Sequence, residues 1–184
     1  AWLGAESGSQ KVLDAMNKGL KVEETREAVR RLQADGVRVG LFLQYGYLGE
    51  TREDIGKTLE MLVELLPDEI GVSVSYPLPG TPFFEQVKAA LGEKTNWVDS
   101  DDLDPMVPGA FRPDYYRRLH RYTHRLFQSR RGLANARRAL SAPSRATREQ
   151  LRSAAATLVH LPAAAVESLL PRRLERSGRA PDGA

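Results

Sequence analysis

The apolar positions in the first ninety residues follow two different spacings. A nearly continuous apolar run covers 37–45 (VRVGLFLQY), which is typical of a strand covered on both faces, and 70–76 (IGVSVSY) is expected to be another strand. Residues 2–4 look like the last residues of an earlier strand. Apolar residues recur at helical spacing over 10–16, 22–34, 51–66 and 81–91. This alternation predicts an α/β fold with parallel strands joined by right-handed crossovers.

Local signals place the ends of these helices. Ser9 is expected to cap the first helix, and Gly19 to end it. Thr51 and Asp54 form a variant of the capping box at the start of the third helix. The turns that follow the strands are short and rich in Gly and Pro, and such carboxyl-terminal ends of parallel strands are where ligands bind.

Beyond residue 91 the pattern changes. Residues 92–109 are irregular and acidic, and 113–128 form a helix whose stripe is Tyr115, Leu119, Tyr122 and Leu126. Residues 131–139 are expected either to extend this helix or to start a new one. Residues 147–170 favour one or two Ala-rich helices broken at Pro162, and 172–184 are expected to be disordered. Three regions result: 1–91 as the α/β unit, 92–140 as an irregular segment with a basic helix packing on it, and 141–184 as an Ala/Arg-rich tail.

Composition narrows the function classes. The 184 residues include no cysteine, which excludes disulfides and thiolate metal sites on this chain. No apolar stretch approaches a membrane span and no signal peptide is recognisable, so we expect a cytoplasmic protein without a membrane partner. The net charge is +3, with Arg concentrated after residue 111. A solvated basic helix explains that bias better than a nucleic-acid partner does.

Three turns carry candidate chemistry: GAESGS, GYLGET and YPLPGTP. Each combines Gly with polar groups where a strand gives way to a helix. Exposed N–H groups there could hold an anion, whereas Glu6 or Glu50 would bind a ribose diol or an ammonium group. The simpler interpretation is that the glycines serve tight turns and the two carboxylates face solvent or cap helices. Three such turns in succession favour a shared pocket, although none matches a phosphate-loop or dinucleotide fingerprint.

The combination of these motifs is specific. GAESGSQKVLDAMNKG, then GVRVGLFLQYGYLGETREDIGKTLEML, then SYPLPGTPFFEQV resembles the C-terminal half of a radical S-adenosylmethionine (radical SAM) domain over residues 2–87. More narrowly, it resembles the branch of the anaerobic magnesium-protoporphyrin ester cyclase, which often carries a cobalamin-binding domain. The resemblance implies the second half of a partial (β/α) barrel with parallel strands, followed by a helical C-terminal extension.

The resemblance also implies which residues contact S-adenosylmethionine. The polar residue after the fourth barrel strand contacts the methionine or ribose part, which here is Glu6 with Ser7 nearby, and a basic residue further on, here Lys18, reaches the same region. The next strand and its loop shape the adenine site, and the following loop closes over it. These two elements supply Phe42, Gln44, Gly46, Gly49, Tyr76, Pro79 and Gly80. The resemblance assigns no catalytic residue and no metal ligand in this chain.

The cofactors implied are S-adenosylmethionine, a four-iron four-sulfur cluster and, in this branch, cobalamin. The cluster motif CxxxCxxC is absent from the sequence, so we expect its ligands, and the N-terminal half of the barrel, to lie upstream. The function implied is that of a radical SAM enzyme fragment, inactive alone, that supplies ribose and adenine contacts and part of the substrate wall. In the full-length protein the reaction would be reductive cleavage to a 5′-deoxyadenosyl radical or cobalamin-dependent methyl transfer on an unknown small molecule.

Two features leave other interpretations open. The chain could instead be a non-catalytic half-barrel whose basic helical tail binds RNA or an acidic partner. His120 and His124, spaced i and i+4, could share a metal, but no third ligand is in view and a packed or surface pair is the better interpretation.

Overall fold

The computed structural model describes residues 1–90 and 111–177. In chain order its elements are β1 (Trp2–Glu6), α1 (Gln10–Ala15), α2 (Val22–Ala34), β2 (Gly40–Tyr45), α3 (Arg52–Leu65), β3 (Glu69–Val74), α4 (Pro82–Val87), α5 (Pro113–Ser141) and α6 (Arg148–Ser177), with short 3-10 turns at Lys88–Ala90 and Pro143–Arg145. The expected irregular segment 92–109 lies outside the described residues.

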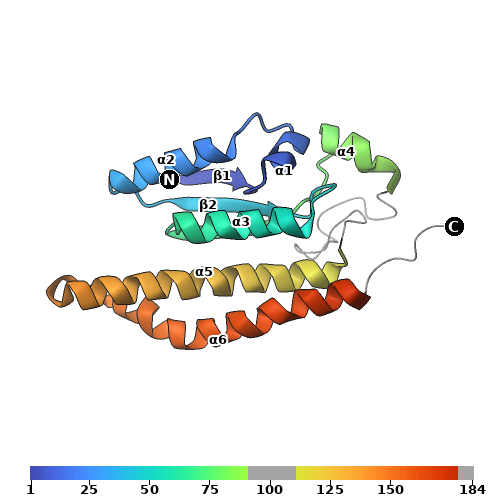
Figure 1. Ribbon diagram of the computed structural model, residues 1–184. Coiled ribbons are helices and arrows are strands. Elements are labelled where there is room, and N and C mark those ends of the chain that lie inside the picture. Colours follow the sequence, from blue (N-terminus) through green and yellow to red (C-terminus); the bar gives the residue numbers. More distant parts are fainter. Residues whose placement is uncertain (91–110, 178–184) are drawn as a thin grey trace.

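The three strands form one open parallel sheet in the order β1-β2-β3. Leu41 of β2 lies beside Leu3 on one side and Ile70 on the other, and the register of β1 shifts between Gly4 and Glu6. Helices alternate with the strands, and a helical part follows them (Figure 1). The α/β fold with parallel strands is therefore confirmed, and the sheet is consistent with part of a barrel.

One face of the sheet carries the core. Alternate residues of β2 (Leu41, Leu43 and Tyr45) are fully buried on this face. The main core cluster joins Leu41 and Leu43 to residues of α1, α2 and α3 and to Phe127 of α5, whereas Tyr45 belongs to the second cluster. A second cluster, at the carboxyl end of β2, contains Tyr115 and Tyr116 of α5. The long helix α5 thus closes the core beside α3 (Figure 1).

The other face of the sheet is open, which corrects the expectation that the strand over 37–45 is covered on both sides. Trp2 and Phe42 stack with ring centroids 4.5 Å apart, and they remain 48% and 50% exposed. Their rings lie against Gly40 and Gly71, where any Cβ would approach them within 2.7 Å. This surface is called the open face below. The apolar run 37–45 therefore combines residues of one buried face with Phe42, which is exposed on the open face and stacks on Trp2.

Both C-terminal helices are continuous, and for α5 this is one of the two alternatives that the sequence left open over residues 131–139. The helix α5 continues past residue 128 to Ser141, and its buried stripe includes Tyr116, Thr123 and Phe127 in place of Tyr122 and Leu126, which are only partly buried. The helix α6 passes through Pro162 without a break and extends to Ser177, beyond the expected start of disorder at residue 172. Residues 178–184 lie outside the described residues.

Packing along α5 explains the continuity of α6. The two helices run side by side (Figure 1), and Gly132 of α5 allows a close approach to α6. A Cβ at this glycine would lie 1.8 Å from the hydroxyl of Thr157 and 2.6 Å from the carbonyl oxygen of Ser153. Tertiary packing of this kind can offset the free-energy cost of about 3 kcal/mol that Pro brings to a helix interior.

Candidate functional site

Three loops meet at the carboxyl ends of the strands, as the sequence predicts. The ammonium of Lys11, in the first turn of α1, donates to the carbonyl oxygen of Gly49 at 2.7 Å. The hydroxyl of Tyr47 donates to the carbonyl oxygen of Ala15 at 3.0 Å, and its ring stacks on Phe83 of α4. The β2–α3 loop is therefore fixed to both α1 and α4.

Glu6 and Lys18 form an ion pair at the end of β1. The Nζ of Lys18 lies 3.0 Å from Oε1 of Glu6, and the lysine is about half exposed. Glu6 adopts a left-handed backbone conformation with φ of 56°, which is uncommon for a residue with a side chain. Its carboxylate folds back over Gly4, where a Cβ would lie 3.0 Å from Oε1. Because Gly4 is the neighbour of Phe42 in the sheet, the carboxylate lies on the open face.

The rest of this turn packs against α3 and forms hydrogen bonds with it. Ser7 is buried, and its hydroxyl lies 3.1 Å from that of Thr58 and accepts the N–H of Ser9. A Cβ at Gly8 would lie 2.4 Å from the carbonyl oxygen of Lys57, so this position needs glycine for close backbone approach. The hydroxyl of Ser7, expected near the cofactor, is thus already paired within the protein.

Asp54 is the centre of the hydrogen bonds beneath the loops. Its carboxylate accepts from the hydroxyl of Ser9 at 2.6 Å, from the N–H and hydroxyl of Thr51, and from Lys11 at 3.1 Å. Burial alone would raise the pKa of Asp54, but these hydrogen bonds together lower it well below its usual range. The capping box of Thr51 and Asp54 is confirmed. Ser9 does stand at the N-cap of α1, but its side chain bonds Asp54 in place of that helix.

Glu50 is buried, contrary to the expectation that it faces solvent, a ligand or a helix end. Its Oε2 accepts the N–H of Gly46 at 2.6 Å, while Oε1 has no hydrogen-bond partner within the described residues. Burial raises the pKa of Glu50 to about 7, although the N–H of Gly46 acts in the opposite direction. Gly46 and Gly49 both have positive φ angles, so the carboxylate closes a tight loop around itself.

The remaining predicted residues lie either on the open face or in the exposed loop between β3 and α4. Phe42 lies on it, and Gln44, two residues further along β2, is half-buried on the same side. Tyr76 is exposed beyond the end of β3, and Gly80 has a φ of 83° in the turn before α4. The sequence did not point to Trp2 as a residue of this face, because its stacking on Phe42 depends on the register of β1 against β2.

Two other features are separate from this site. His120 and His124 lie with ring centroids 4.5 Å apart and are partly buried, which lowers the pKa of both imidazoles. No group of three metal-ligating side chains occurs in the part of the chain that the structure describes. A cavity of about 630 Å³ lies at the amino ends of the strands, where Arg131 donates to the carbonyl oxygen of Asp68 and pairs with Glu149.

Comparison with known proteins bears on the family resemblance of the chain. The chain is 37% identical over 87 residues to a tRNA-2-methylthio-N(6)-dimethylallyladenosine synthase of Aromatoleum aromaticum, a match that covers 44% of this chain and 18% of the relative. It is 33% identical over 86 residues to the anaerobic magnesium-protoporphyrin IX monomethyl ester cyclase of Cereibacter sphaeroides, covering 47% and 14%. It is also 33% identical over 84 residues to a putative methylthiotransferase of Methanocaldococcus jannaschii, covering 46% and 19%.

The resemblance to the C-terminal half of a radical SAM domain is thereby confirmed. Each match covers less than a fifth of the relative's own length. No family model matches the chain.

Proposed function

We propose that this chain supplies the ribose and adenine contacts for S-adenosylmethionine, and part of the substrate wall, in a radical SAM enzyme. When bound with its iron-sulfur cluster in the full-length protein, the cofactor supplies a 5′-deoxyadenosyl radical or, in cobalamin-dependent relatives of this branch, a methyl group. The sequence holds no cysteine, so residues outside this chain would hold the cluster. The proposal concerns only what the residues of this chain do.

The Glu6–Lys18 pair carries the proposal. The methionine part of the cofactor is a zwitterion, and a carboxylate paired with an ammonium 3.0 Å away offers the complementary charges. Glu6 would accept hydrogen bonds from the cofactor ammonium or the ribose diol, and Lys18 would donate to its carboxylate. The left-handed conformation of Glu6 supports this role, because such strain clusters at functional sites.

The neighbouring elements fit the rest of the ligand. Phe42 and Gln44 would lie beside the adenosine part, one offering a ring face and the other an amide. Glu50 would act indirectly, because it fixes the N–H of Gly46 and so the shape of the loop. Trp2, stacked on Phe42, would form part of the substrate wall on the open face.

Substitution of Glu6 tests the proposal. Glu6→Ala in reconstituted full-length protein is expected to weaken S-adenosylmethionine binding by about 1.5–3 kcal/mol, the usual contribution of a hydrogen bond to a charged group. Glu6→Gln keeps one acceptor and should lose less. Isothermal titration calorimetry measures the affinity, and a thermal melt checks the fold.

Glu85→Ala is the matched control, because Glu85 is an exposed carboxylate of α4 that pairs with Lys88 across one helical turn. Its affinity for the cofactor should equal that of the wild type. Unchanged affinity in Glu6→Ala would show that this turn does not bind the cofactor. A lowered melting temperature with unchanged affinity would make the Glu6–Lys18 pair a structural one.

A further inference from the structure

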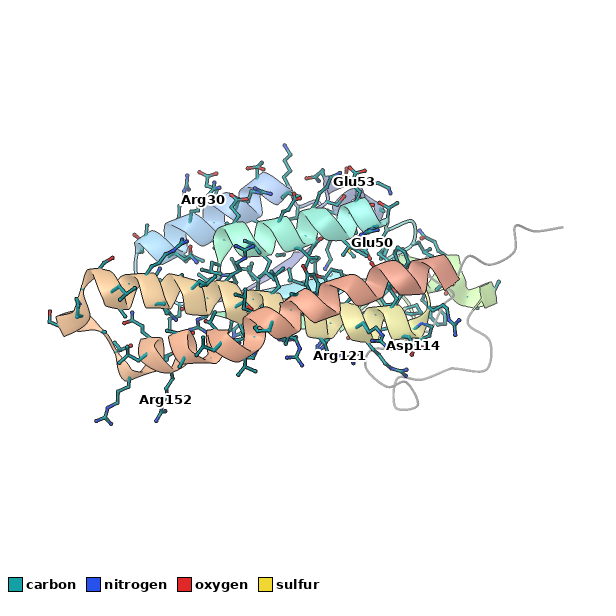
Figure 2. The ribbon with its side chains drawn as sticks, turned by 60° about the horizontal axis from the view of Figure 1, so that its bottom comes forward. Arg30, Glu50, Glu53, Asp114, Arg121 and Arg152 are labelled. Carbon is teal, nitrogen blue, oxygen red and sulfur yellow. The ribbon has the colours of Figure 1, made fainter. Side chains whose placement is uncertain are left out.

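One side of α5 faces the cavity at the amino ends of the strands. This cavity, of about 630 Å³, is bounded by the segments before β2 and β3, by α5 and by the start of α6. Arg131, Asn135 and Arg138 line it, and their spacing of four and three residues places them on one side of the helix. Figure 2 shows Arg30 on the side of the α/β unit nearer the turn between α5 and α6, and Glu50 on the other side. The cavity is therefore remote from the loops of the proposed cofactor site.

The side-chain amide of Asn135 is the unusual group in this cavity. Asn135 is only 6% exposed, and its amide has no hydrogen-bond partner within residues 1–90 and 111–177. Nearly all buried polar side chains in proteins are hydrogen-bonded, because an unpaired amide loses its bonds to water on burial. An amide that is buried, unpaired and part of a cavity wall indicates that a molecule in the cavity pairs with it.

The unpaired charge beside Asn135 is positive. Three carboxylates also line the cavity, and each already has a partner in the protein: Glu64 accepts from two arginines of α2, Asp68 accepts the N–H of Val39, and Glu149 pairs with Arg131. The guanidinium of Arg138 has no such partner in the described part of the chain. The Glu149 side chain is 75% exposed and lies 3.3 Å from Arg131, so an anion in the cavity could take its place.

We propose that this cavity binds a small organic phosphate monoester, with the phosphate held by Arg131, Asn135 and Arg138. Each guanidinium presents N–H donors in a fixed fork that matches phosphate oxygens, and the amide of Asn135 adds a donor between them. A phosphate has three acceptor oxygens and a carboxylate has two, so the phosphate satisfies more of these donors. The volume exceeds what the phosphate alone needs and lies in the range of small-molecule sites. This inference is independent of the proposed cofactor site.

The outer side of the α5–α6 pair fits a ligand less well than the cavity does. Single-stranded nucleic acid is bound by stacking bases on exposed aromatic side chains, but Tyr115, Tyr116 and Phe127 of α5 are buried. Within residues 1–90 and 111–177, none of the helices combines the length and the hydropathy that a bilayer-spanning segment needs. A concave site with a buried amide and an unpaired guanidinium is instead suited to a small anion.

Calorimetric titration of the protein at its natural length tests the proposal. The probes are ribose 5-phosphate, inorganic phosphate, ribose and succinate. Ribose 5-phosphate should bind more tightly than inorganic phosphate, succinate should bind more weakly than either, and ribose should not bind. Arg138→Gln should weaken the binding of ribose 5-phosphate at least about tenfold, because a charge-assisted hydrogen bond is lost. Arg138→Lys keeps the charge without the fork and should give an intermediate affinity.

Asn135→Ala separates a ligand group from a structural one. It should weaken binding about tenfold without lowering the melting temperature of the unliganded protein, because no hydrogen bond within the described residues is lost. Arg137→Gln is the matched control, since Arg137 is the exposed neighbour of Arg138 and does not line the cavity; its affinity should equal that of the wild type. Any of four results would overturn the proposal: no binding of either phosphate probe, equal binding of succinate and inorganic phosphate, equal losses in Arg137→Gln and Arg138→Gln, or a lower melting temperature with unchanged affinity in Asn135→Ala.

Discussion

The α/β unit of residues 1–90 and the helical pair α5–α6 stabilise themselves in different ways. In the α/β unit, few side chains make many specific contacts: Asp54 alone accepts four hydrogen bonds from Ser9, Lys11 and Thr51. In the helical pair, the close contact depends on the absence of a side chain at Gly132. The first arrangement fixes the positions of individual atoms, as a ligand site requires. The second brings two long helices together and leaves their outer sides available.

The two regions also respond to pH in opposite directions. Burial raises the pKa of Glu50 to about 7 in the α/β unit, so its stability falls as the pH rises towards neutrality. Burial lowers the pKa of His120 and His124 on α5, so their contribution is lost as the pH falls. The following predictions test this comparison, from the largest effect to the smallest.

Removal of Asp54 should have the largest effect. Asp54→Ala leaves the buried hydroxyl of Ser9 and the N–H of Thr51 without an acceptor, and should lower the free energy of unfolding by about 3 kcal/mol. Asp54→Asn should cost less, since its amide oxygen keeps one acceptor. Chemical denaturation followed by circular dichroism gives the values. Glu53→Ala, one residue away and exposed, should change stability by less than about 0.5 kcal/mol; a similar loss in both variants would contradict the central role of Asp54.

A methyl group at Gly132 should separate the two helices. Gly132→Ala forces Cβ against Thr157 and the backbone of Ser153, and should cost about 2 kcal/mol through overpacking. Relative to the wild type, amide hydrogen exchange should become faster in α6 and should change less in β2. Gly56→Ala is the matched control, because nothing lies within 4 Å of its Cβ and α3 should gain up to about 1 kcal/mol. If α6 exchanges at the wild-type rate in Gly132→Ala, the close packing of the two helices is wrong.

The effect of Glu50 on the pH dependence of stability should be smaller than the effects of Asp54→Ala and Gly132→Ala. Its sign should be opposite to that of the histidines. In the folded chain Glu50 keeps its proton up to about pH 7. In the unfolded chain the carboxyl group loses the proton near its ordinary pKa of 4.5. Between these values the folded state binds more protons, so stability falls as the pH rises. Relative to Glu50→Gln, the wild type should lose about 1–2 kcal/mol between about pH 5 and pH 7.5.

Urea denaturation at a series of pH values measures this difference. The histidine contribution is common to both proteins and cancels when they are compared. Glu53→Gln, an exposed neighbour, should follow the wild-type curve. Parallel curves for wild type and Glu50→Gln would mean that Glu50 is ionised in the folded protein throughout this range.

The sequence predicted local structure well where the signals were local. The helix predicted over 22–34 matches α2, and the capping box predicted the start of α3, because both depend on residues three or four positions apart. The sequence left open whether residues 131–139 extend the helix over 113–128 or start a new one, and only the packing of α6 against Gly132 shows why one continuous α5 forms. Pro162 failed as a signal for a related reason: packing along α5 holds the helix together.

For the candidate site, the sequence by itself determined which residue types stand after each strand, and the parallel topology brought the three loops to one end of the sheet. It could not determine which carboxylates are buried. Glu6, Glu50 and Asp54 look alike in the sequence, yet one is paired with Lys18 on the open face, one is closed into its own loop and one is satisfied by four hydrogen bonds. Only the tertiary structure decided this, because the environment of a carboxylate depends on neighbours that are up to 45 residues away along the chain.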